Sequence, residues 1–112
     1  MSNYCIDLDT PEAREIGFIS DIFDGYLWRR NNHITISAIY SRQPGQGNLS
    51  RLFDAILAKG LDVRVPNPLP RMELICKKKG FTKTQEPFAP EHGIHDLIDV
   101  YVLKAEESKD AE

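Results

Sequence analysis

The chain has 112 residues, a length that suits one folded domain with a single hydrophobic core. Its 41% hydrophobic content excludes wholesale disorder, and no apolar run approaches the roughly 18 residues of a membrane span. The first residues lack the basic start and apolar stretch of a secretory signal, and two cysteines make no disulfide framework, so we expect a cytoplasmic protein.

Charge is distributed unevenly along the chain. Residues 1–24 carry a net charge of −5, residues 25–83 a net charge of +8 and residues 84–112 a net charge of −6. A basic middle suits an anionic ligand held by the central segment, and a solvated basic surface explains it equally well. The total of −3 argues against a general nucleic-acid coat.

The first predicted element is a helix that begins at Thr10-Pro11-Glu12. Thr is a good N-cap, Pro suits the first helical position and Glu suits the first turn. Apolar residues then recur at helical spacing as far as Phe23, and Gly25 is a candidate for the end of this helix.

A β-hairpin is predicted next. Residues 26–30 and 33–41 flank Asn31-Asn32, and Asn tolerates the positive φ that a tight turn needs. In the second arm, β-branched and other side chains alternate between two faces, which is typical of a strand.

A turn rich in Gly and Pro, residues 42–48, leads into a predicted helix that Gly60 ends. The apolar stripe of that helix consists of Leu49, Leu52, Phe53, Ile56 and Leu57. The remaining predicted elements are a strand over 61–65, a helix over 71–79, and strands over 81–85 and 97–103 that a long loop joins. That loop, residues 86–96, holds His92 and His95, which suit a flexible polar loop better than a metal site.

These elements predict an α/β fold of the α+β type, built on one strand–helix–strand crossover. We expect a single domain over residues 1–104, followed by an acidic flexible tail over residues 105–112.

The junction of strand, glycine-containing loop and helix carries the clearest chemical signal. A helix N-terminus has unsatisfied N–H groups and a positive dipole, and glycine lets an anion approach the backbone. The alternative is a turn that binds nothing. The candidate backbone donors are those of Gln46, Gly47, Asn48, Leu49 and Ser50.

The chain resembles the core of the GCN5-related N-acetyltransferase (GNAT) superfamily. That core has a strand, a Gly-rich pyrophosphate loop that opens a helix, a strand, and a helix that ends in a basic-Gly-Phe signature. This chain has ITISAIYSRQPGQGNLSRLFDAIL, then LDVRV, then MELICKKKGF, and its last two predicted strands match the family's closing hairpin. In its small size it is similar to short acetyltransferase-like proteins that some phages encode.

The resemblance implies a mainly antiparallel GNAT-like sheet with one βαβ crossover and splayed central strands. It also implies transfer of an acetyl group from acetyl-CoA to an amine, without a metal. The pantetheine arm is expected to lie against the first central strand, near Ile39 and Ser41, and the diphosphate on the five loop residues named above. The acceptor, on a protein, a nucleic acid or a small molecule, stays open.

Two residues take catalytic roles by resemblance. Cys76 stands where the family often has a Tyr that protonates the departing thiolate. Asn67 directly follows the second central strand, where the family often has a residue that touches the pantetheine arm or a catalytic water. Alternatively, Cys76 fills the core and Asn67 shapes a turn between two prolines. The sequence departs from the family at Pro44, which stands at the loop's Arg/Gln position, and in residues 34–41, which contain no carboxylate. His33, at the start of that strand, is the nearest candidate for the missing base, and it also suits a surface position in the hairpin.

Two other functions stay open. The first is a catalytically degenerate descendant that binds a macromolecular partner, in a phage a host factor. The second is a nucleic-acid-binding module, which requires a set of basic residues to share one face. A homodimer through a sheet edge or the last hairpin is compatible with the sequence, which does not determine the oligomeric state. The basic set consists of Arg29, Arg30, Arg42, Arg51, Lys77, Lys78 and Lys79.

Overall fold

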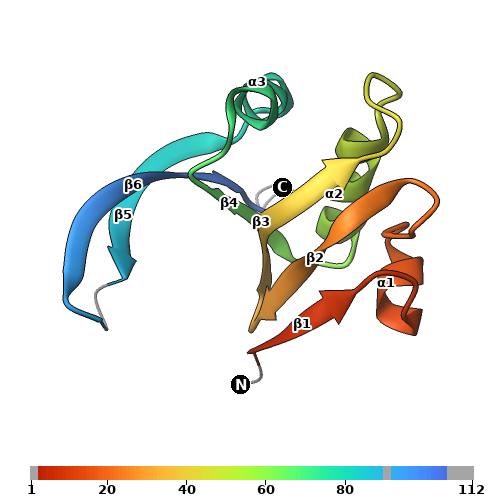
Figure 1. Cartoon of the computed structure of the whole chain (residues 1–112), viewed down its shortest axis with the longest axis horizontal. Coiled ribbons are helices and arrows are strands. Elements are labelled where there is room, and N and C mark those ends of the chain that lie inside the picture. Colours follow the sequence, from red (N-terminus) through yellow and green to blue (C-terminus); the bar gives the residue numbers. More distant parts are fainter. Residues whose placement is uncertain (1–2, 90–91, 106–112) are drawn as a thin grey trace, which may run out of the picture.

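The computed structural model describes residues 3–89 and 92–105, which form a mixed α+β fold (Figure 1). Its mainly antiparallel open sheet has six strands in the order β1-β2-β3-β4-β6-β5, and three helices pack against it. The strands are β1 Asn3–Asp7, β2 Phe23–Arg30, β3 His33–Ser41, β4 Asp62–Pro66, β5 Thr82–Ala89 and β6 Ile94–Leu103. The helices are α1 Pro11–Glu15, α2 Asn48–Ala58 and α3 Pro70–Lys79.

The two central strands, β3 and β4, form the parallel pair of this sheet, and α2 makes the crossover between them. Their pairing covers only His33 to Thr35 of β3, against residues 62–64 of β4. On its other side β3 pairs with β2 as far as Ser41. Residues 36–41 of β3 therefore have no strand partner on the β4 side among the described residues.

A β-bulge lies where this pairing ends. Tyr26 pairs with Ala38 and Trp28 with Thr35, so β3 contains one more residue than β2 over this interval. A bulge bends its strand and increases the local twist. We infer that this bend directs the second half of β3 away from β4.

Gly25 keeps β2 attached to the bent half of β3. It pairs with Ile39 and has a φ of +114°, which L side chains rarely adopt. A Cβ atom at this position would lie 2.0 Å from the carbonyl oxygen of Ala38, so the close approach of the two strands requires glycine.

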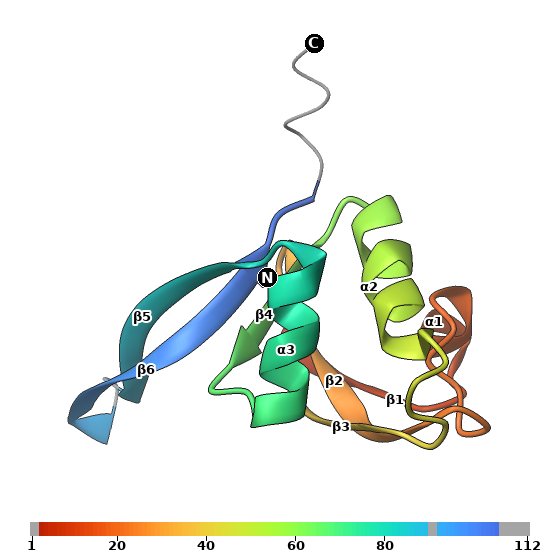
Figure 2. The same ribbon diagram turned by 90° about the horizontal axis from the view of Figure 1, so that it is seen from above.

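The hydrophobic core lies between the sheet and the helices. From α2 it takes Leu52, Phe53 and Ile56, and from α3 it takes Cys76. The Phe53 and Phe81 rings, 5.1 Å apart, join α2 to the residue that precedes β5. Viewed from above, α2 and α3 stand side by side with their N-terminal ends toward the same edge (Figure 2).

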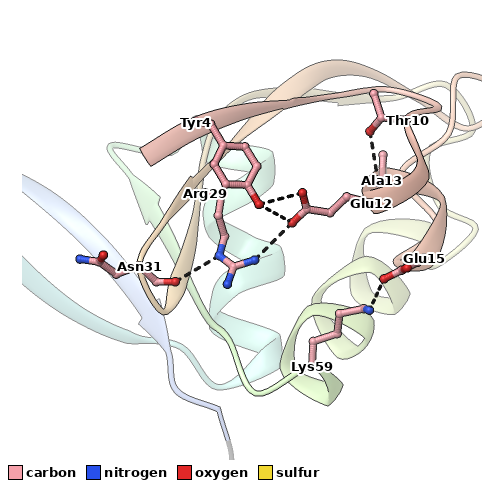
Figure 3. Close-up of polar contacts among 8 residues, drawn as sticks. All are labelled: Tyr4, Thr10, Glu12, Ala13, Glu15, Arg29, Asn31 and Lys59. Atoms are coloured by element: carbon pink, nitrogen blue, oxygen red, sulfur yellow. Dashed lines mark hydrogen bonds and ion pairs between the residues drawn. The ribbon is translucent and has the colours of Figure 1, made fainter. Parts of the chain in front are cut away.

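Polar contacts attach the N-terminal segment to the rest of the domain (Figure 3). The Tyr4 hydroxyl donates to the Glu12 carboxylate at 2.8 Å, and Arg29 approaches the same carboxylate at 3.2 Å. Lys59 forms an ion pair with Glu15, which ties α1 to the end of α2. Hydrogen bonding to Glu12 raises the pKa of Tyr4.

The structure confirms the predicted hairpin, the two helices α2 and α3, and the strand–helix–strand crossover. The extent of the first helix is wrong: α1 ends at Glu15, Gly17 turns the chain with a φ of +81°, and Phe23 already belongs to β2. Gly25 consequently lies inside a strand and ends no helix. Strand β1 was not predicted; its central residues Tyr4, Cys5 and Ile6 form a short apolar run without alternation.

The closing hairpin is longer than predicted. Strand β5 continues to Ala89 and β6 starts at Ile94, so most of the expected loop is paired strand. Pro87 is tolerated because β5 is an edge strand of the sheet. Of the predicted tail, residues 106–112 lie outside the described residues. Ala105 is buried, and its N–H donates to the Asp62 carboxylate at 2.7 Å.

Candidate functional site

The divergence of β3 and β4 leaves a gap between them that forms a small cavity of about 90 Å³. Five consecutive residues of β3, 36–40, line one side of it. Val65, Asn67 and Leu69, from the end of β4 and the loop after it, line the other side. Because consecutive strand residues point to opposite faces, the gap lies at the level of the strand backbone itself.

A larger groove of about 930 Å³ adjoins this gap. Its walls are the first turn of α2 and one face of α3, and the end of β3 and the loop after it complete the lining. The groove and the gap share four lining residues, so the two lie directly beside each other. The shared residues are Ile39, Tyr40, Leu69 and Met72.

The N-terminus of α2 presents free backbone donors to the groove. Its N-cap is Gly47, with a φ of +77°, and no side chain of the described chain caps the helix. The first turn also contains no acidic residue. The N–H groups of Asn48, Leu49 and Ser50 therefore have no acceptor within the helix. Such a helix start favours an anion.

Arg51 holds the loop before α2 in place. Its guanidinium donates to the Gln46 carbonyl at 2.9 Å and to the Asn48 side-chain oxygen at 2.5 Å. The side-chain nitrogen of Asn48 is buried and has no hydrogen-bond partner in the described structure. An unpaired buried donor is unfavourable unless an acceptor reaches it, so the loop has donor capacity to spare beside the groove.

The charged side chains among the described lining of the groove are all cationic. Arg71, Lys78 and Lys79 of α3 line it, and its described lining contains no carboxylate. Lys79 forms an ion pair with Asp54 of α2 at 2.7 Å, which joins the two helices. A cationic groove at a helix N-terminus is complementary to a phosphorylated ligand.

The structure brings most of the predicted binding residues together. Ile39, Ser41, Gly47, Asn48, Leu49 and Ser50 all line the groove. Gln46 is not part of the lining, and its carbonyl is occupied by Arg51. Pro44 does line the groove and offers no N–H there.

Asn67 lies in the turn directly after β4 and lines the gap. Its φ is +46°, and its N–H donates to the Asp99 carbonyl at 2.7 Å. Asn is among the residues that tolerate this left-handed conformation best. Asn67 therefore shapes the turn, and the same position brings it to the gap, so both interpretations of this residue remain compatible with the structure.

Cys76 lies away from the cavity. It is 0% exposed, belongs to the core, and lines neither the groove nor the gap. Burial, with a smaller contribution from Glu73, raises the pKa of its thiol to about 12. This placement agrees with the alternative in which Cys76 fills the core.

The predicted basic set does not gather on one surface. Arg29 and Arg30 lie at the hairpin end of β2, whereas Arg42 and Arg51 lie beyond the opposite end of β3, about 25 Å away along the strand. His33 also lies at the hairpin end, where burial and then Arg64 and Arg30 lower its pKa. It is therefore remote from the groove.

Tyr40, Arg71 and Lys78 are among the lining residues that were not singled out as site residues from the sequence. Tyr40 is 63% exposed and borders both the groove and the gap. Arg71 and Lys78 are seven positions apart on α3 and share its groove face. A spacing of seven places residues on one face of a helix, but the sequence does not indicate what that face meets.

No group of three or more metal-ligating side chains occurs within residues 3–89 and 92–105, and His92 and His95 are both exposed. None of the described helices is long and apolar enough to cross a membrane. No family model, curated protein or solved structure matches this chain.

Proposed function

We propose that the protein is a GNAT-like acyltransferase that transfers an acetyl group from acetyl-CoA to an amine. One observation carries the proposal: the groove at the N-terminus of α2 adjoins the gap between the two parallel strands and shares lining residues with it. Acetyl-CoA has a phosphorylated nucleotide at one end and an uncharged thioester arm at the other. The two parts of the site differ in the same way: cationic side chains line the groove, and uncharged residues line the gap.

The groove supplies the features that a diphosphate needs. The free N–H groups of Asn48, Leu49 and Ser50 offer donors, and the α2 dipole favours negative charge at that point. Pro44 removes one donor from the loop, and the cationic side chains of α3 compensate for it on the facing wall.

The gap supplies a place for the thioester arm. Residues 36–41 of β3 lack a strand partner on the β4 side, so backbone donors and acceptors are available there. An extended amide-containing arm can pair with such a strand as an added strand does. This pairing fixes the thioester beside Asn67 and Tyr40.

In the proposed step, the neutral amine attacks the thioester carbon, a C–N bond forms and the C–S bond breaks. The amine nitrogen gives its extra proton to water, and the thiolate takes up a proton as it leaves. Tyr40 is the proposed donor of that proton, since it is the titratable side chain in the described lining of the gap. Holding the thioester beside the amine supplies most of the acceleration through proximity.

Calorimetric titration with acetyl-CoA tests the proposal. We expect saturable binding, with ATP binding at least about tenfold more weakly because it lacks the arm that pairs with β3. ATP binding as tight as that of acetyl-CoA would contradict a role for the gap. Absence of acetyl-CoA binding at millimolar concentration would overturn the proposal.

A non-catalytic binding protein on the same fold is the second candidate. The observation that favours it is that neither a carboxylate nor a histidine is found in the described lining of the gap, while Cys76 is buried. Acetyl-CoA binding without release of free thiol, in the presence of a panel of protein, nucleic-acid and small-molecule amines, would support this second candidate over the first.

A further inference from the structure

Three consecutive lysines at the end of α3 have three different surroundings. Lys77 faces Glu73 on its own helix at 3.9 Å and is not part of the groove. Lys79 is held by Asp54 of α2 at 2.7 Å. Lys78 lines the groove and has no ion-pair partner within the described part of the chain. One cation of the three is therefore available to a ligand.

Lys78 and Arg71 occupy opposite ends of the groove face of α3. They are seven positions apart, which corresponds to about 10 Å along the helix axis. Arg71 lies at the N-terminal end of α3, on the same edge of the fold as the N-terminus of α2 (Figure 2). Lys78 lies two turns further along. The groove thus offers two separated positions for anions.

We propose that Lys78 binds a phosphomonoester that is separate from the diphosphate held by α2 and Arg71. This inference rests on the proposed function and assigns Lys78 to one particular group of its donor. The ribose of coenzyme A carries a diphosphate chain on its 5′ oxygen and a phosphomonoester on its 3′ oxygen, so the ligand has the two anionic groups that the groove can take. The donor is then a free acyl-CoA, and a thioester that lacks the 3′-phosphate is a poor substitute.

The test compares coenzyme A with dephospho-coenzyme A, which differs only by the 3′-phosphate. Calorimetry gives the dissociation constants of both ligands for the wild-type protein and for Lys78→Ala, Lys78→Arg and Lys77→Ala. Lys77→Ala is the matched control, because it removes the same charge from the neighbouring position outside the groove. Lys78 is exposed, so its substitution leaves the core intact.

We expect the wild-type protein to bind coenzyme A about tenfold more tightly than the dephospho form, as one charged hydrogen bond warrants. Lys78→Ala should abolish this preference by weakening coenzyme A alone, Lys78→Arg should keep it, and Lys77→Ala should change neither ligand by more than about twofold. Equal wild-type affinity for the two ligands, or equal losses in Lys78→Ala, would overturn the inference while leaving the proposed function in place. Failure of both ligands to bind the wild-type protein would overturn both.

Discussion

The two halves of β3 differ in the strand partners that their backbone N–H and C=O groups have. Over His33 to Thr35 the strand pairs with β2 on one side and with β4 on the other. Beyond the bulge at residues 36 and 37, residues 38–41 pair with β2 alone, and the other side of this half borders a cavity. Buried backbone groups require partners, so the first half is complete as it stands, whereas the second half can accept an extended ligand as its missing neighbour.

The difference arises from two local features. The bulge between Thr35 and Ala38 bends β3, and Gly25 lets β2 follow the bend without a steric clash. The same strand therefore contributes to the rigid centre of the sheet and to the candidate binding site.

The largest effect is expected from Gly25→Ala, which disrupts the bent half directly. The new Cβ would meet the Ala38 carbonyl at 2.0 Å in a backbone conformation that already disfavours alanine. We expect a loss of about 3 kcal/mol or more in the free energy of unfolding, measured with urea. Gly60→Ala is the control: it has a φ of +80° with no atom within 4 Å of the new Cβ, and should lose about 1 kcal/mol. Equal losses in the two variants would contradict the close approach of β2 and β3.

Ser50→Glu tests the anion-binding end of the cavity. A carboxylate in the first turn of α2 competes with the diphosphate for the same N–H groups and repels it, so we expect acetyl-CoA affinity to fall by about a hundredfold. The fold should be unaffected or slightly more stable, because an acid suits the helix dipole there.

Ser50→Gln is the matched control for size without charge. It should lose less than about fivefold in affinity, and both variants should unfold at wild-type urea concentrations or above. Similar losses of acetyl-CoA affinity in the two variants would show that the larger side chain, and not its negative charge, weakens binding.

Tyr40→Phe separates binding from chemistry. The change removes a hydroxyl from a side chain that is 63% exposed, so stability and acetyl-CoA affinity should stay within about twofold of wild type. If Tyr40 protonates the leaving thiolate, kcat should fall by at least about tenfold in an assay of free thiol release. An unchanged kcat would exclude this role.

The smallest catalytic effect is expected at Cys76. Cys76→Ala should leave kcat within about twofold and cost about 1 kcal/mol of stability through lost packing. Burial raises the pKa of this thiol to about 12 from its ordinary value of 9.0. As pH rises, the thiol of the unfolded chain therefore loses its proton before the thiol of the folded chain does. The contribution of the buried thiol to the free energy of unfolding is complete below pH 9 and is lost as pH rises toward 12.

Urea unfolding between pH 8 and pH 10.5 checks the pH dependence. The wild-type protein should lose stability more steeply than Cys76→Ala above about pH 9. Identical slopes would show that the thiol is not shielded from water, and a large loss of kcat in Cys76→Ala would restore its catalytic role.

Local patterns predicted much of the fold. The apolar stripe of α2 has helical spacing, and Leu52 and Phe53 are indeed buried against the sheet. The sequence predicts too long a first helix, because Ile19 and Ile22 continue the helical spacing of apolar residues. In the structure the chain turns at Gly17, before these two residues. Strand β1 is short, and its pairing with β2 depends on contacts that no local pattern encodes.

The candidate site was only partly accessible to sequence reasoning. The loop before α2 could be identified from its glycines and from the helix that follows. The availability of Lys78 could not be identified in this way, because it depends on the ion pairs that Lys77 and Lys79 form with Glu73 and Asp54. The extent of the gap could not be predicted either, since no residue type marks where β3 stops pairing with β4.

Hydrogen exchange of backbone amides along β3, with and without acetyl-CoA, tests the central claim most directly. We expect amides within residues 33–35 to be protected in both states. Amides within residues 36–41 that face β4, and those of residues 47–50, should exchange quickly in the free protein and slow down at saturating acetyl-CoA. If saturating ligand leaves the exchange of both segments unchanged, the unpaired half of β3 is not where acetyl-CoA binds.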